Sequence, residues 1–145
     1  MKISGYIDIN KPQDEVVKYF NNSDYAKEYQ DTFLRKVLIS GEKGEENTIS
    51  KIYYKHGKGE MELTETITKN NLPDSFEAFF NHKHMDNTMV CKFEELDKNN
   101  TRYHYEYEYI RMTLIPKIFS KINPGMFSKP AEKWLAQFKE FVEKQ

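Results

Sequence analysis

Several common features are missing from this sequence of 145 residues, and each absence excludes a class of protein. A single cysteine, Cys91, excludes an intrachain disulfide framework and a cysteine-cluster metal site. No apolar run approaches the ~20 residues that a membrane span requires. Basic and acidic residues nearly balance, at 22 and 23, so the overall charge carries no signature of nucleic-acid or anionic-membrane binding. No linker-like stretch and no internal repeat divides the chain, so we expect one domain over residues 1–145.

The N-terminal part predicts a strand followed by two short helices. Apolar and polar residues alternate over residues 2–9, which is typical of a strand. This alternating start, with the early acidic residue Asp8, is not typical of a secretory signal, so we expect a cytoplasmic protein. Pro12 suits the first turn of a helix, and Ser23 can cap a second short helix that runs through Tyr29.

From Phe33 onward the apolar residues recur with a period of two, which predicts strands. Turn signals rich in glycine, asparagine and aspartate divide this region, and such short connections favour antiparallel hairpins. The expected strands lie near residues 33–40, 48–55, 60–68, 75–84, 87–96 and 101–112.

After Thr113 the apolar period becomes helical again. A first helical stretch is interrupted at residues 123–125, and Pro130 is expected to open a long terminal helix. A sheet of seven strands cannot leave its apolar face in water, so the sheet is expected to curve around this helix, with a cavity between them. The apolar stripe of the helix consists of Ala131, Trp134, Leu135, Phe138, Phe141 and Val142.

This order of elements, together with four short motifs, resembles a known superfamily. The motifs are IDINKPQDEV at residues 7–16, NNLP at 70–73, NTRYHY at 100–105 and WLAQFK at 134–139. They are similar to segments of the START-like superfamily, also called SRPBCC, which includes birch-pollen-allergen proteins, polyketide cyclase/dehydrase-like proteins and lipid-transfer domains. The resemblance implies an α+β helix-grip fold with a pocket for an apolar small molecule. Relatives on this scaffold bind, carry or convert ligands, so the resemblance does not decide between these activities.

The last expected strand carries four tyrosines on one face. Tyr103, Tyr105, Tyr107 and Tyr109 alternate with charged residues, so the tyrosines are expected to point inward. They either fill volume in a β-rich core or line a cavity with hydroxyls that need hydrogen-bond partners. In the second case the pocket is amphipathic.

Glu65 shares its inward register with Met61, Leu63 and Ile67. An inward carboxylate must be paired or protonated, so we expect it to accept a hydrogen bond from one of the inward tyrosines or from His82. Such a contact is either structural or part of ligand recognition.

Two histidines and the cysteine complete the candidate residues. His82 and His84 are expected on one face of the fifth strand, inward or at the pocket rim. A metal site would need a further ligand, for which Glu65 is the candidate, so metal, pocket and structural roles all stay open. Cys91 is interpreted as a small buried hydrophobe, because no basic neighbour activates it as a nucleophile.

The leading hypothesis is a protein that binds or transports a hydrophobic or amphipathic small molecule, lipid-like or polyketide-like, with no cofactor and no metal. The alternatives are a cyclase/aromatase- or hydratase-type enzyme that uses Glu65 or His82 as general acid/base, and a co-chaperone-like interaction module. Nucleic acid and integral membrane association are not expected, and monomer and homodimer both stay open. A fatty-acid-binding-type barrel is rejected, because that fold has more strands and no terminal helix. The expected ligand-binding residues are Leu63, Glu65, Phe80, His82, Tyr105, Tyr107, Ile118, Ile122 and Phe138.

Overall fold

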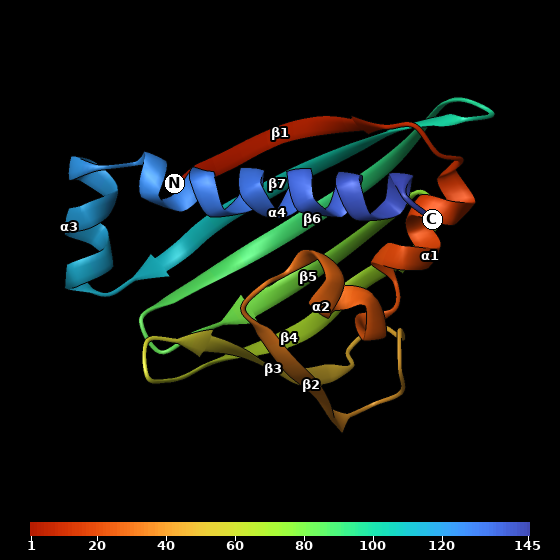
Figure 1. The fold of residues 1–145 in the computed structure, drawn as a ribbon. Helices are drawn as coiled ribbons and strands as arrows, with labels where there is room; N and C mark the ends of the chain where they lie inside the picture. Colours follow the sequence, from red (N-terminus) through yellow and green to blue (C-terminus); the bar gives the residue numbers. More distant parts are fainter.

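The structure is a computed structural model that describes residues 1–145, and its centre is one curved antiparallel sheet (Figure 1). The seven strands pair in the order β1-β7-β6-β5-β4-β3-β2, so β1 and β2 form the two free edges. This confirms the expected seven-stranded antiparallel sheet. The strands are β1 (Lys2–Ile9), β2 (Phe33–Ser40), β3 (Ile49–His56), β4 (Gly59–Asn71), β5 (Ser75–Asn81), β6 (Met85–Asp97) and β7 (Asn100–Met112).

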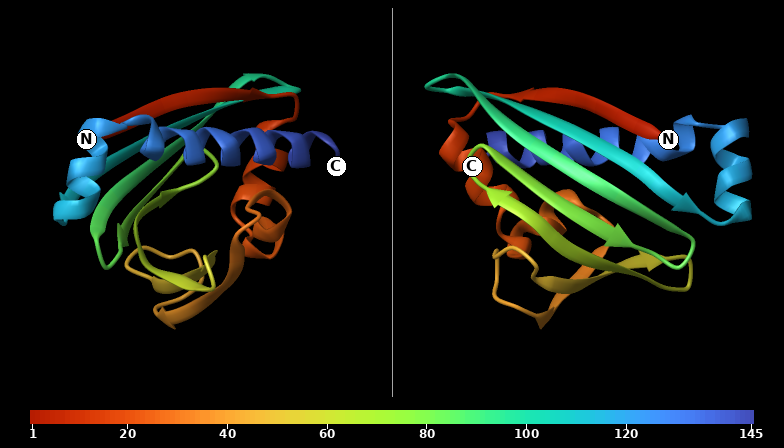
Figure 2. Two further views of the ribbon diagram at one scale, coloured as in Figure 1. Left: turned by 60° about the vertical axis from the view of Figure 1, so that its left-hand side comes forward. Right: turned by 180° about the vertical axis from the view of Figure 1, so that it is seen from behind.

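Helices occupy the two places that the sequence indicates. After β1 come α1 (Gln13–Phe20), a 3₁₀ turn η1 (Ser23–Tyr25) and the short α2 (Ala26–Tyr29). After β7 come α3 (Leu114–Ile122) and the long α4 (Gly125–Glu143). Helix α4 runs along the concave side of the sheet and packs mainly against β1, whereas α3 stands at one end of the molecule (Figures 1 and 2).

Two helix starts differ from the sequence-based expectation. Helix α4 begins at Gly125, so Pro130 lies inside it instead of opening it. The missing N–H of Pro130 frees the carbonyl of Met126, which is tolerated because Met126 is 45% exposed and water can reach it. Ser23 does not cap the second helical stretch, because Asn22 does: its Oδ1 accepts from the N–H of Asp24 at 3.0 Å.

The fifth strand is also shorter than expected. It ends at Asn81, and the N–H of His82 donates to the carbonyl of Met85 at 2.9 Å, which closes a tight turn before β6. His82 and His84 therefore lie in this turn and not on the strand, so the expectation that both project from one strand face is wrong.

The main core lies where α4 crosses the β1, β7 and β6 side of the sheet. Ile9, Phe93 and Tyr103 from the strands pack in one buried cluster with Leu135 and Phe138 from α4. No helix in the structure combines the length and the apolar character that a membrane span requires.

Candidate functional site

The inner face of the sheet divides into two halves with different packing. In the first, here called the packed half, the inner residues of β1, β6 and β7 lie under α4, and Ile9 and Cys91 are fully buried. Tyr103 stacks on Phe93 with ring centroids 4.8 Å apart, and Tyr105 lies so close over β1 that a Cβ on Gly5 would come within 2.6 Å of its hydroxyl. This half is filled by its own side chains.

The second half, here called the open half, is the inner face of β3, β4 and β5. Its inner residues are Ile52 and Tyr54 on β3, Leu63 and Glu65 on β4, and Phe80 on β5, which face one another through the strand register. Trp134 of α4 reaches across and stacks on Tyr54 at 5.7 Å with an interplanar angle of 16°. Several inner side chains in or next to the open half stay only half-buried. They are Leu63 on β4, Phe80 on β5, Trp134 on α4, and Met89 and Tyr107 on the adjoining strands β6 and β7.

An ion pair lies on the inner face of the open half. Glu65 is 5% exposed, and the Nζ of Lys36 on β2 lies 2.8 Å from its Oε1. Ser50, also buried, stands directly opposite Glu65 on β3. The Glu65 Oε1 accepts no aligned hydrogen bond, so the charge of Lys36 compensates it without satisfying its lone pairs. A buried carboxylate oxygen of this kind is able to accept a hydrogen bond from a polar group placed beside it.

Lys36 is the site residue that the sequence reasoning missed, and a β-bulge explains why. The pairing of β2 with β3 shifts between Phe33 and Arg35, so Phe33 and Lys36 both face inward although their spacing is odd. Simple alternation from Phe33 would turn Val37 inward instead, yet Val37 pairs with Lys51 of the outer face, whereas Lys36 pairs with the inward Ile52. Glu65 is inward as expected, but its partner is Lys36, so the expected hydrogen bond from a tyrosine or His82 is wrong.

The tyrosine hydroxyls of this region are protonated donors at neutral pH. Burial, followed by the charge of Glu65, raises the pKa of Tyr54, and burial raises the pKa of Tyr107 well above its ordinary value. Burial also raises the pKa of Tyr29 to about 12. The Tyr107 side chain is half-buried, so part of it stays accessible on the concave face of the sheet. Only Tyr103 bonds within the protein through its hydroxyl, to Cys91 Sγ at 3.2 Å.

The two histidines lie apart from this ion pair, in the β5–β6 turn. The His82 and His84 rings are 5.7 Å apart, and the backbone N–H of His84 donates to Nδ1 of His82. Burial lowers the pKa of His82, and His84 adds to the effect, so His82 is a neutral, structurally engaged imidazole. No group of three His, Cys, Asp or Glu side chains gathers closely enough to hold a metal ion.

The structure brings four of the nine expected site residues onto one surface and separates the other five from it. Leu63, Glu65 and Phe80 lie in the open half, and Tyr107 borders it. The buried pair Tyr105 and Phe138 belongs to the packed half, and His82 lies in the turn. Ile118 and Ile122 lie on α3, where they are 46% and 73% exposed, away from the other residues.

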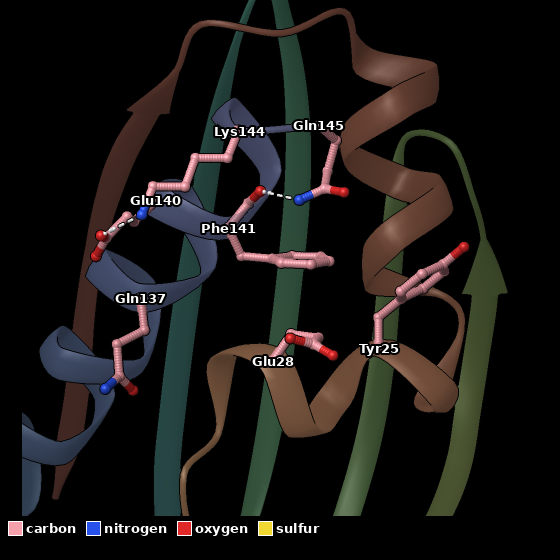
Figure 3. A pocket seen from close by; sticks show the side chains of 7 residues that line it. All are labelled: Tyr25, Glu28, Gln137, Glu140, Phe141, Lys144 and Gln145. Atoms are coloured by element: carbon pink, nitrogen blue, oxygen red, sulfur yellow. Dashed lines mark hydrogen bonds and ion pairs between the residues drawn. The ribbon is translucent and has the colours of Figure 1, made fainter.

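A pocket that the sequence did not indicate lies between α2 and the C-terminal end of α4, and not between the sheet and α4, where the cavity was expected (Figure 3). Its walls are mostly polar, and its two aromatic rings, Tyr25 and Phe141, already lie 5.9 Å from each other. Lys144 and Glu140, four residues apart on one wall, form an ion pair of 2.8 Å along its rim. These walls offer little apolar surface to a ligand, so this pocket is a weaker candidate than the open half.

Comparison with solved structures identifies the architecture. Zhui aromatase/cyclase from Streptomyces sp. R1128 superposes with a TM-score of 0.80 over 99% of this chain and 94% of that chain, at 9% identity. Ara h 8.0201 gives 0.78 over 100% and 99% at 8% identity, and TTHA0849 from Thermus thermophilus gives 0.76 over 98% and 97% at 14% identity. The chain has the helix-grip fold of these structures. No family model matches the sequence, and no curated protein matches it.

At identities of 8 to 14% the likeness is one of fold, and it confirms the architecture that the motif resemblance implied. A shared helix-grip fold hosts different activities, so the function has to be argued from the residues of the inner face.

Proposed function

We propose that the chain binds an amphipathic small molecule on the inner face of the open half, beside the strands that α4 covers. The observation that carries this proposal is the Lys36–Glu65 ion pair, which lies inward among half-buried apolar side chains. Glu65 is buried while the Lys36 side chain is 29% exposed, and the desolvation cost of such a carboxylate offsets much of what the pair contributes to stability. Its presence beside accessible apolar surface is therefore better explained by recognition of a polar group.

The surroundings of the ion pair match the two ends of such a ligand. Leu63, Phe80 and Met89 provide apolar surface, whose burial contributes roughly 25 cal/mol per Å². The hydroxyls of Tyr54 and Tyr107, protonated at neutral pH, provide hydrogen-bond donors. A small molecule with a flat or branched apolar body and one carbonyl or hydroxyl end fits this combination.

The chain contains its own reporter and its own control for a binding test. Trp134 is the only tryptophan, and it stacks on Tyr54 at the edge of the open half. A second ion pair, Lys51–Glu62, has the same 2.8 Å separation but lies on the outer face of the sheet. The inner and outer glutamates therefore form a matched pair on one strand.

The experiment titrates Nile red, a neutral apolar dye with a carbonyl group, and follows the quenching of Trp134 emission. Wild type and Glu62→Gln are expected to bind the dye equally. Glu65→Gln replaces a carboxylate, which only accepts hydrogen bonds, by an amide that can donate to the dye carbonyl, and is expected to change the Kd by about three- to tenfold. Equal affinity in all three proteins, or no quenching in wild type, would overturn the proposal. Native mass spectrometry of the purified protein then searches for the natural ligand.

A second candidate is a cyclase- or aromatase-type enzyme. One observation favours it: Glu65 lies close enough to Tyr54 for its charge to help raise the pKa of the Tyr54 hydroxyl. A carboxylate and a proton donor therefore share the same inner surface. One similar solved structure is named an aromatase/cyclase. In such a reaction Glu65 would remove a proton from a carbon next to a carbonyl, and ring closure would end with loss of water.

The enzyme candidate is tested with a linear polyketone thioester, with mass spectrometry following the loss of water. Conversion by wild type and Glu62→Gln but not by Glu65→Gln would support the enzyme. Dye binding without any conversion would support the binding protein.

A further inference from the structure

Helix α3 is strongly amphipathic, and its apolar side is uncovered. Its apolar residues fall within an arc of about 140° when successive residues are placed ~100° apart around the helix. None of its residues is buried, and the helix stands at one end of the molecule, beyond the sheet (Figures 1 and 2). The exposed apolar patch, here called the α3 patch, consists of Leu114, Ile115, Ile118, Phe119, Ile122 and Met126.

The charge around the α3 patch is positive, although the whole chain is nearly neutral. Residues 109–131 contain four basic residues and no acidic residue. The rest of the chain holds the other 18 basic residues and all 23 acidic ones. Arg111 is neutralised by Asp86 at 2.7 Å, whereas Lys117, Lys121 and Lys129 have no acidic partner within 4.0 Å. The near-zero net charge therefore conceals a basic end of the molecule.

We propose that the α3 patch docks on an anionic lipid surface, with α3 lying in the plane of the interface. Nine residues form a helix of about 14 Å, far short of the ~30 Å hydrocarbon core, so α3 can lie on a membrane but cannot cross it. Its apolar side enters the headgroup region while Lys117 and Lys121, one turn apart beside one edge of the apolar arc, reach the lipid phosphates.

The charge also argues against a second copy of the chain as the occupant. Pairing two α3 patches would bring the unpaired lysines of both copies together, with no acidic residue in the segment to offset them. An anionic surface offsets the same lysines, and each is expected to strengthen binding about fivefold. The proposal does not depend on what the open half binds.

The test is flotation of the full chain with vesicles of phosphatidylcholine, with and without phosphatidylserine. Wild type is expected to float with the anionic vesicles, to remain unbound with phosphatidylcholine alone, and to be released by added salt. Lys117→Gln/Lys121→Gln and Ile115→Ser/Ile122→Ser are each expected to lower the bound fraction about tenfold or more.

Matched controls come from exposed residues elsewhere. Lys58→Gln/Lys98→Gln removes two exposed, unpaired lysines, and Val37→Ser/Ile39→Ser removes apolar surface from the β2 edge. Both are expected to bind vesicles as wild type does. The proposal is overturned if wild type does not float, or if controls and α3 variants weaken binding equally. It is also overturned if the chain instead forms a dimer without lipid that Ile115→Ser/Ile122→Ser abolishes.

Discussion

The packed half and the open half belong to the same sheet face, yet their inner residues differ in kind. Beneath α4, Ile9, Cys91 and Phe93 are almost completely buried. On β2 to β4 the inward positions hold the ion pair of Lys36 and Glu65 beside the buried Ile52 and Tyr54. The difference follows the position of α4, which packs mainly against β1. Where the helix covers the sheet, apolar packing provides stability, and where it does not, the sheet keeps polar groups that a ligand can use.

The largest expected effect comes from removing packing beneath α4. Phe138 is 3% exposed and contacts the rings of Tyr29 and Tyr103 at 4.8 and 5.9 Å. Phe138→Ala is expected to lower the free energy of unfolding by about 3–5 kcal/mol. Trp134→Ala is expected to cost less, about 1–3 kcal/mol, because Trp134 is only half-buried. Urea unfolding followed by circular dichroism measures both, and equal losses would contradict the division into halves.

The next largest loss of stability is expected from breaking the inner ion pair, with the outer ion pair as its control. Lys36→Met leaves Glu65 inward without its cation and is expected to cost about 1–3 kcal/mol. Lys51→Met breaks an exposed pair of the same length and is expected to cost about 0–1 kcal/mol. Lys36→Met/Glu65→Leu is expected to recover most of the stability, since it removes both charges. Thermal melts rank the three variants, and a Lys51→Met loss as large as that of Lys36→Met would refute the inner role.

Alkaline pH should weaken the fold through its buried tyrosines. Burial raises the pKa of Tyr29 from 10.0 to about 12 and raises the pKa of Tyr103 well above its ordinary value. Because the folded state holds these protons more tightly, stability is fully present below pH 10 and falls as the pH rises toward 12. The melting temperature measured over this range should decline, and Tyr103→Phe should make the decline shallower. An identical slope in that variant would contradict the assignment.

The smallest expected effect at neutral pH is the slow chemical labelling of the Cys91 thiol in the packed half. Burial raises the pKa of Cys91 to about 12, so the reactive thiolate is scarce. Labelling by a maleimide is expected only through opening of the fold. Leu63→Cys on a Cys91→Ala background places a thiol in the open half, where labelling is expected to be at least about tenfold faster. Equal rates would show that both halves are equally closed.

Much of the fold could be predicted from the sequence because alternation and helical period are local signals. They predicted the seven strands, the stripe on α4 and the inward tyrosines of β7. They also predicted that Glu65 faces inward, because its strand keeps a regular register with β3.

The rest depends on features that local patterns do not reveal. The bulge in β2 reverses which residues face inward, so Lys36 was not found. The position of α3 depends on the connections at its two ends, so Ile118 and Ile122, expected among the ligand-binding residues, lie on an exposed patch. The early end of β5 depends on a backbone bond from His82 to Met85, which places the histidines in a turn.

The most direct test of the central claim is a nuclear magnetic resonance titration of the isotope-labelled chain with Nile red. If the open half is the binding surface, the largest amide shift changes should cluster at residues 50–54, 63–67 and 78–80. The amides of β1 and the C-terminal turns of α4 should change little. Changes confined to the α2–α4 pocket, or to the strands beneath α4, would contradict the account.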